Sequence, residues 1–207
     1  MAADPQNWAG LKASLANWIN RDDLNETEIP EAISLAERRF QRLLVTPDRE
    51  AEALLPVAGE TVTLPADCWG IRAAWLETDP RSSLEPLPLA ELRRAWPASA
   101  TGRPCQYAVR GAAMILGPAP DAACSLRLTY LQTIPPLGAS QPSNWLLAAH
   151  PDAYLHAALF ELFSLTMDEQ RAAYHEAKLG LVLDEINRAG RRRAAGQPRR
   201  IRSAIVV

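Results

Sequence analysis

The chain has 207 residues, of which 48% are hydrophobic and 22% are charged, a composition that is typical of a globular protein and excludes a disordered one. No apolar run approaches the ~20 residues of a membrane-spanning helix, and the first ten residues lack a basic or apolar leader, so we expect neither a membrane span nor a secretory signal. The three cysteines, Cys68, Cys105 and Cys124, follow no disulfide or metal-binding spacing, which predicts free thiols in a reducing compartment.

The net charge of −2 hides an asymmetry along the chain. Glu185 is the last acidic residue, and seven arginines follow it. Residues 188–207 therefore carry a charge of +7, whereas residues 1–187 hold 15 basic and 24 acidic side chains and carry −9. A basic end on an acidic body is typical of an interaction arm.

Two amphipathic helices are predicted in the first 50 residues. Residues 7–20 repeat apolar side chains at helical spacing, and a second helix runs from Pro30 to about Leu44. Thr46-Pro-Asp ends the second helix, because the residue before a proline is disfavoured in the helical region. The expected buried stripes are Trp8, Leu11, Leu15, Trp18 and Ile19 in the first helix, and Ile33, Ala36, Phe40 and Leu43 in the second.

Short strands are predicted in the middle of the chain, where twelve of the seventeen prolines lie between residues 56 and 142. A short helix is expected from Leu89 to Trp96, and residues 125–131 alternate cleanly between apolar and polar side chains. This pattern favours a small, mostly antiparallel sheet. The expected strands are residues 61–64, 70–76, 106–110 paired with 113–116 as a hairpin, and 125–131.

Two long helices are predicted between Asn144 and Arg193. The first follows Pro151, which suits a first helical turn because it has no N–H to leave unpaired. Thr166-Met-Asp-Glu169 then has the pattern of a capping box that begins the second helix. That helix carries Leu179, Leu183 and Ile186 on one edge and Tyr174, Ala177 and Leu181 on the next. The expected core residues of the pair are Leu155, Leu159, Leu162, Phe163 and Leu183.

These elements predict an α+β fold, with a helical bundle, an inserted small antiparallel β domain and an extended C-terminal arm. The bundle is assigned to residues 1–50 and 143–193, the β domain to residues 51–142, and the arm to residues 194–207.

No catalytic, cofactor or metal site is predicted. His150 and His156 are six residues apart and cannot share a helix face, and the acidic cluster around Asp22 and Asp23 lacks the spacing of a calcium loop. The motifs of phosphate-binding loops and of nucleophilic catalysis do not occur. We therefore expect a protein that is not an enzyme and that holds no cofactor and no metal ion.

The arginine-rich end is the predicted partner-binding segment, with an apolar, β-prone terminus that suits pairing with a partner's strand or groove. Gly190, Gly196 and Pro198 are expected to break the helix there and let the chain change direction. The alternative is a frayed, solvated end. The predicted binding residues are Arg188, Arg191, Arg192, Arg193, Arg199, Arg200, Ile201, Arg202, Ile205, Val206 and Val207.

The order of short motifs along the whole chain resembles the adaptor, or head-to-tail connector, proteins of tailed bacteriophages, of the type that pairs a helical bundle with an inserted β domain. No single motif carries the resemblance, but their order and spacing do. The motifs are Asn20-Arg21-Asp22-Asp23-Leu24, Ile29-Pro30, Leu35-Ala36-Glu37-Arg38-Arg39, Leu64-Pro65-Ala66-Asp67, Gly102-Arg103-Pro104 with Tyr107, Leu116-Gly117-Pro118-Ala119-Pro120, Leu128-Thr129-Tyr130, Asn144-Trp145-Leu146-Leu147 and Pro151-Asp152-Ala153-Tyr154-Leu155-His156-Ala157-Ala158-Leu159.

The resemblance implies a structural virion protein at the head–tail junction, assembled in the host cytoplasm. It implies a homo-oligomeric ring of twelve copies that joins the portal protein to the tail tube or nozzle proteins and extends the channel through which genomic DNA passes without specific binding. In this family the C-terminal segment reaches the portal, which agrees with the arginine-rich end. The alternative function is a nucleic-acid-binding packaging or regulatory module that uses the same arginines on phosphates. The acidity of the rest of the chain and the lack of a recognition motif weigh against that alternative.

Overall fold

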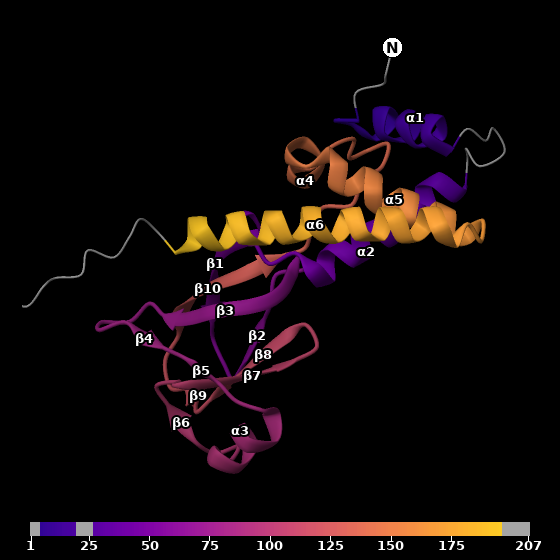
Figure 1. Cartoon of the computed structure of the whole chain (residues 1–207). Helices are drawn as coiled ribbons and strands as arrows, with labels where there is room; N and C mark the ends of the chain where they lie inside the picture. The colour runs from indigo at the N-terminus through magenta and orange to yellow at the C-terminus, as the bar shows by residue number, and fades with distance from the viewer. Residues whose placement is uncertain (1–4, 20–26, 196–207) are drawn as a thin grey trace, which may run out of the picture. The chain divides into compact units, whose positions relative to one another are not determined.

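The computed structural model describes residues 5–19 and 27–195. They form an α+β protein, as the sequence predicts, and divide into two compact units. The helical unit comprises residues 1–48 and 134–207, and the β unit comprises residues 49–133 (Figure 1). Residues 134–142, assigned to the insert from sequence, group with the helical unit, because Ile134 and Leu137 are buried in its core.

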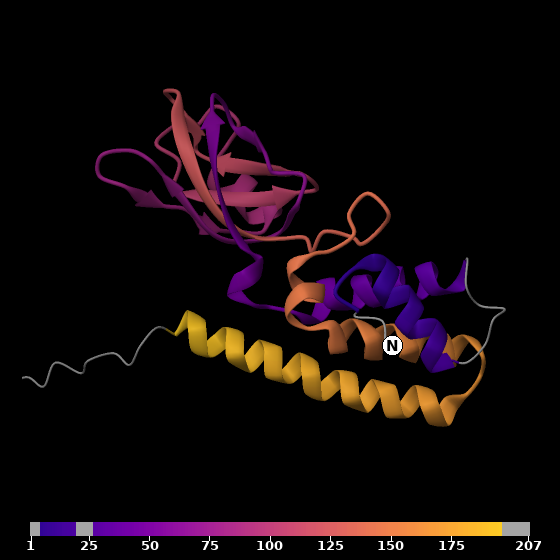
Figure 2. The same ribbon diagram turned by 90° about the horizontal axis from the view of Figure 1, so that it is seen from above.

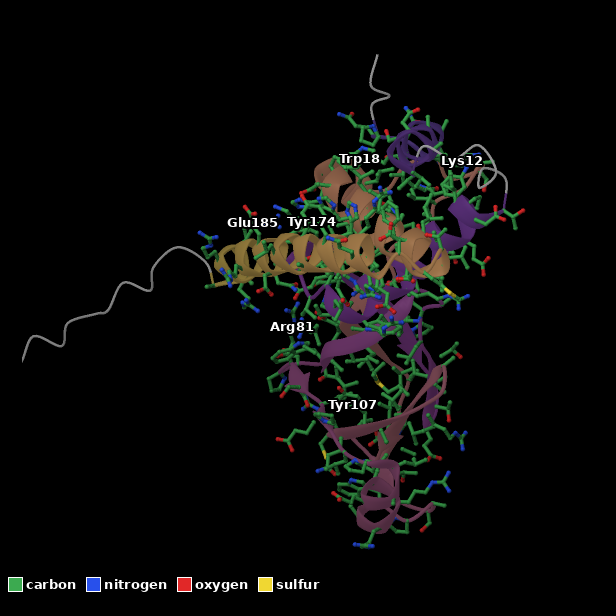
Figure 3. All side chains as sticks on the ribbon, turned by 45° about the vertical axis from the view of Figure 1, so that its right-hand side comes forward. Lys12, Trp18, Arg81, Tyr107, Tyr174 and Glu185 are labelled. Carbon is green, nitrogen blue, oxygen red and sulfur yellow. The ribbon has the colours of Figure 1, made fainter. Side chains whose placement is uncertain are left out.

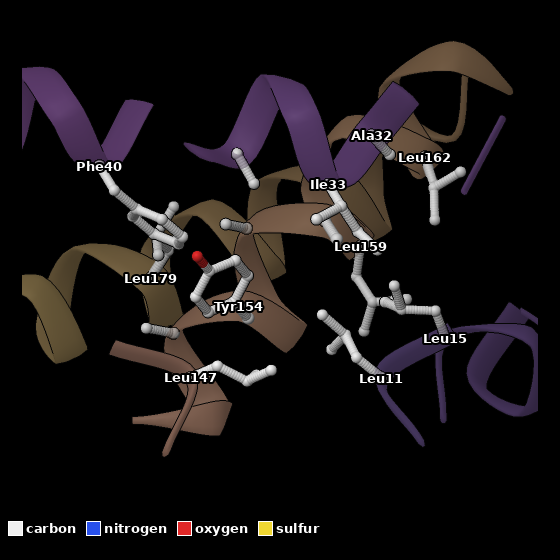
Figure 4. Close-up of a cluster of buried hydrophobic side chains, with 14 of the residues drawn as sticks. Leu11, Leu15, Ala32, Ile33, Phe40, Leu147, Tyr154, Leu159, Leu162 and Leu179 are labelled. Atoms are coloured by element: carbon white, nitrogen blue, oxygen red, sulfur yellow. The ribbon is translucent and has the colours of Figure 1, made fainter. Parts of the chain in front are cut away.

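The helical unit is built around α5 (Pro151–Leu165), which packs against α1 (Trp8–Ile19), α2 (Glu28–Leu43) and α6 (Glu169–Ala194). The short α4 (Trp145–Ala149) precedes α5, and α6 lies antiparallel to α5 along its length (Figure 2). Figure 4 shows how side chains from α1, α2, α5 and α6 meet in one core. Its fully enclosed members include Leu11, Leu15, Ile33, Phe40, Leu147, Tyr154 and Leu159.

Helical periodicity places most of the expected core residues correctly. Leu159, Leu162, Phe163 and Leu183 are buried, but Leu155 is only half-buried and packs at the edge of the core. Two residues of the expected N-terminal stripes also face solvent, since Trp18 is 56% and Leu43 is 48% exposed. On α6 the edge with Leu179 is buried and the edge with Tyr174 and Leu181 is exposed.

The turn between α5 and α6 is capped differently from the predicted capping box. Asp168, not Thr166, is the N-cap of α6, and its carboxylate accepts a hydrogen bond from the Arg171 N–H at 3.1 Å. Thr166 instead ends α5, because its hydroxyl donates back to the Leu162 and Phe163 carbonyls, both at 3.2 Å. Met167, with φ of 57°, lies in the left-handed region and reverses the chain between the two caps.

A buried polar network ties the segment after the β unit to the helices. Glu37 on α2 accepts hydrogen bonds from the Leu137 N–H at 2.7 Å and from the Tyr154 hydroxyl at 3.3 Å. The side chain of Asn144 donates to the Tyr154 hydroxyl oxygen at 2.7 Å and caps α4 by accepting from the Leu147 N–H at 2.8 Å. Because every member is bonded, the network orients α2, α4 and α5 against one another.

The β unit contains more strands than the sequence predicts. One sheet has the order β1 (Glu50–Val57), β10 (Cys124–Gln132), β3 (Cys68–Leu76) and β4 (Ser82–Ser83). A second sheet has the order β2 (Thr61–Thr63), β8 (Ala113–Gly117), β7 (Gln106–Arg110) and β5 (Glu85–Pro86), and a third pairs β6 (Thr101–Gly102) with β9 (Ala119–Pro120). The β5–β7 and β6–β9 pairs are parallel, and the others are antiparallel.

The first two sheets share one core. β10 turns Leu126, Leu128 and Tyr130 into it, in the predicted alternation, and β8 contributes Met114 and Leu116. The opposite face of β8 and β7 is covered by α3 (Leu89–Ala95), where Leu92 packs on Ala108 and Ile115. β1 was missed from sequence because its inward side chains include two alanines and it contains Pro56, which is tolerated because β1 lies at a sheet edge.

Candidate partner interface

The described part of the arginine-rich segment is the last two turns of α6. Arg188, Arg191, Arg192 and Arg193 are helical and exposed, so the helix continues to Ala194 instead of breaking at Gly190. Three of the four lie in the last turn, where positive charge is favourable because it opposes the helix dipole. Arg199, Arg200, Ile201, Arg202, Ile205, Val206 and Val207, with Gly196 and Pro198, lie outside the described residues.

Gly190 is a contact residue, not a helix breaker. It is buried against Thr46 and Pro47, and a Cβ added to it would lie 3.1 Å from Pro47 Cδ and 3.2 Å from Thr46 Cβ. The missing side chain therefore lets α6 approach the segment after α2 closely. Sequence reasoning treated the glycine as a local conformational signal and could not see its neighbour.

Two of the four arginines form ion pairs with acidic residues of the same chain. Arg193 makes a two-pronged contact with Asp48, with N···O distances of 2.9 and 2.5 Å. Arg188 pairs with Asp184 one turn earlier at 3.5 Å. Exposed ion pairs of this kind contribute little to the free energy of folding. Arg191 and Arg192 form no ion pair with another described residue, so their guanidinium groups are the ones that remain available to a partner's carboxylates.

Two histidines meet between α5 and α6, which the sequence spacing did not reveal. The Nδ1 atoms of His156 and His175 lie 3.0 Å apart, and the His175 ring stacks on Phe163 at 5.5 Å between centroids. Burial lowers the pKa of both imidazoles. The charge of Lys178 adds to the shift of the His156 pKa and Asp152 opposes it, and the neighbouring His156 ring adds to the shift of the His175 pKa because the two rings disfavour being protonated together. Both rings are therefore neutral in the folded protein at neutral pH, with one Nδ1 donating to the other.

The pair lacks the further ligands of a metal centre. Across residues 5–19 and 27–195, no group of three or more histidine, cysteine, aspartate or glutamate side chains is placed to hold a metal ion. Searching the same residues also finds no helix that is both long and apolar enough to span a membrane.

A groove with an acidic rim lies between α2 and α5. It has a volume of about 230 Å³, and its apolar wall includes Leu35 and Leu165, which are 40% and 60% exposed. Glu28, Glu31 and Glu161 lie on its rim. Among the described residues only Glu161 of these three forms an ion pair, with Arg39 at 3.2 Å.

One protein family matches nearly the whole chain. A comparison with family models aligns residues 6–202 with the SU10 adaptor protein family. A search of curated proteins returned no match. The aligned range includes both compact units and the arginine-rich end of α6. The chain therefore belongs to the SU10 adaptor protein family and is a structural adaptor protein of a bacteriophage.

Proposed function

We propose that this protein forms a ring of twelve copies at the head–tail junction of the virion, where it joins the portal protein to the tail tube or nozzle proteins. The family match across residues 6–202 is the observation that carries the proposal. A ring subunit needs lateral contacts, a portal-facing segment and a tail-facing surface, and the two compact units offer separate surfaces for these tasks.

The portal-facing segment in this proposal is the end of α6 with the C-terminal arm that follows it. Arg191 and Arg192 are exposed in the last turn, and guanidinium forks pair well with carboxylates on an acidic partner. Charge alone makes a weak contact, because exposed ion pairs each contribute about 0–1 kcal/mol. The apolar Ile201, Ile205, Val206 and Val207 supply the burial and strand pairing that charge cannot.

The acidic remainder of the chain fits a channel wall. Residues 1–187 carry a net charge of −9, and like charge keeps DNA from adhering as it passes. Specific DNA recognition plays no part in this function.

The test mixes the full-length protein with purified portal rings and examines the complexes by electron-microscopy class averages. We expect an added ring below the portal, formed by the wild type and weakened in Arg191→Glu/Arg192→Glu. The matched control is Arg93→Glu/Arg94→Glu, the same charge change at exposed arginines in the last turn of α3.

Two results contradict the proposal. One is that no ring forms on the portal. The other is that the protein binds mixed-sequence DNA in a salt-dependent manner through Arg191 and Arg192, which supports the nucleic-acid-binding alternative.

A further inference from the structure

An aromatic stripe lies on the exposed flank of α6 and on the neighbouring end of α1. We define it as Trp18, Tyr174, Lys178 and Leu181. Its three large apolar members are 56%, 56% and 68% exposed in that order. Trp18 meets the His175 ring edge-on at 6.2 Å, and Lys178 Nζ lies 5.7 Å from the centre of the Tyr174 ring. Figure 3 labels Trp18 on α1 and Tyr174 on α6. Single exposed apolar residues are ordinary, but here three residues at helical spacing on α6 are joined by Trp18 of α1, and together they make a larger surface.

The groove between α2 and α5 has the complementary chemistry. Its wall is apolar, at Leu35 and Leu165, and its rim carries the carboxylates of Glu28 and Glu31, which pair with no cation among the described residues. The stripe offers apolar side chains around one ammonium group, Lys178, which likewise forms no ion pair within the described part. An aliphatic or aromatic side chain fits such a groove, and the rim carboxylates then face a cation at its edge.

The stripe and the groove lie on different flanks of the helical unit. Glu176 and Asn187 mark the flank of α6 that faces α2, through Arg39 at 3.5 Å and the Val45 N–H at 2.9 Å. At about 100° per residue, Tyr174, Lys178 and Leu181 lie about 140–200° around the helix from Glu176. One subunit therefore cannot bring its own stripe to its own groove.

We propose that the aromatic stripe of one subunit docks into the acidic-rimmed groove of a second copy of this chain. The contact joins two different surfaces, so each subunit keeps one free stripe and one free groove, and repetition closes a ring when the rotation between subunits permits. The inference rests on the proposed ring and names the surfaces by which neighbouring subunits meet.

Disulfide trapping between two variants tests the contact. The background replaces Cys68 and Cys124 with alanine and Cys105 with serine, because all three are free thiols. Leu181→Cys and Leu165→Cys are made separately in this background and mixed under mild oxidation. We expect a covalent dimer that contains one of each variant, and a ladder of higher species when both cysteines are in one chain. The matched control pairs Leu165→Cys with Leu54→Cys, which replaces a leucine of the β unit that is 59% exposed, against 68% for Leu181.

A charge exchange tests the polar part of the contact in the same assay. Lys178→Glu or Glu31→Lys alone should reduce the trapped yield about two- to fivefold, and the two together should restore it. The proposal is overturned when the mixed pair traps no more than the Leu54 control, or when Leu181→Cys alone gives the main product, which indicates a symmetric contact.

A second measurement does not depend on the cysteine-free background, and it therefore applies even when that background fails to fold. Tyr174→Asp/Leu181→Asp and Leu35→Asp/Leu165→Asp, made in the native chain, replace only exposed side chains. Each should prevent closed rings on purified portals while single subunits still bind them. Normal rings from both variants would contradict this inference and leave the proposed function intact. Trapped ladders from a protein that does not bind portals would support the contact between subunits and contradict the proposed function.

Discussion

At the scale of single residues, the buried ionisable groups are the positions where the chain is most sensitive to pH. Glu37 is buried in the helical core, and burial raises the pKa of its carboxyl, although hydrogen bonds from the Leu137 N–H and the Tyr154 hydroxyl oppose the shift. The same burial, with Glu37 nearby, raises the pKa of the Tyr154 hydroxyl, so that this group remains a donor. Every member of the network is hydrogen-bonded, but keeping the Glu37 carboxylate ionised in this buried position costs folding free energy.

Replacing Glu37 with glutamine should remove one component of the pH dependence of stability. Because the folded pKa is raised, the folded state holds this proton more tightly, and the contribution is greatest below the ordinary value of 4.5 and is lost as the pH rises through the raised value. Denaturant unfolding of the wild type and Glu37→Gln across this range should therefore show the variant gaining relative stability with rising pH. A difference that stays constant with pH contradicts the prediction, and Glu185→Gln on the exposed flank of α6 is the control (Figure 3).

The histidine pair should produce the opposite trend. The pKa values of His156 and His175 are both lowered from 6.5, so their contribution is present above that value and is lost as the pH falls towards the lowered values. Protonation also places two N–H donors against each other at 3.0 Å. The decline in unfolding free energy below pH 6.5 should be smaller in His156→Gln/His175→Gln than in the wild type.

At the scale of elements, the ends of α6 depend on contacts that the sequence shows only in part. Its start is capped by Asp168, where the sequence pattern predicted Thr166. Its last turns are held by the Gly190 contact with Pro47 and by the Arg193–Asp48 pair. Asp48 and Arg193 are 145 residues apart in the chain, so no local pattern could pair them.

Gly190 and Gly180 make a matched pair within one helix. A Cβ added at Gly180 would meet no atom within 4 Å, so Gly180→Leu should stabilise the protein by up to about 0.5–1 kcal/mol, because leucine has the higher helix propensity. Gly190→Leu should destabilise it by about 1–3 kcal/mol, because its side chain is forced against Pro47 and Thr46. Thermal and denaturant unfolding measure both, and similar effects for the two variants would show that the contact at Gly190 is unimportant.

At the scale of the whole molecule, hydrophobic periodicity predicted the α+β class, the two long helices and the inserted β region. It succeeded where one face is buried, as in β10 with Leu126 and Leu128. It failed where tertiary contacts decide which side chains are buried and which ones meet. Trp18 fits a buried stripe but is exposed, and His156 and His175 come together from different helices. The acidic groove arises from side chains on α2 and α5 that are more than 120 residues apart, and no sequence motif predicts it.

Deleting residues 196–207 should leave both units folded and abolish ring formation on the portal. The core of the helical unit, as far as the structure describes it, is built from residues between Leu11 and Ile186, so circular dichroism and the unfolding midpoint should change little. Ring assembly on purified portals should be lost, because the apolar terminus and Arg199, Arg200 and Arg202 are removed. Assembly with unchanged affinity would mean that the segment is only a solvated end.

The contacts at Gly190 and Arg193 fix the point from which the arm departs, and this has a consequence for the kinetics of assembly. The twelve residues from 196 to 207 can span at most ~40 Å, so the last residue of each subunit lies within that distance of Ala195. If the subunits assemble in the proposed ring, the binding of one subunit brings the C-termini of its neighbours close to the remaining sites on the partner, at effective concentrations that reach the millimolar range for short tethers. Individually weak attachments would then act together, and an attached ring would dissociate far more slowly than any one of its subunits.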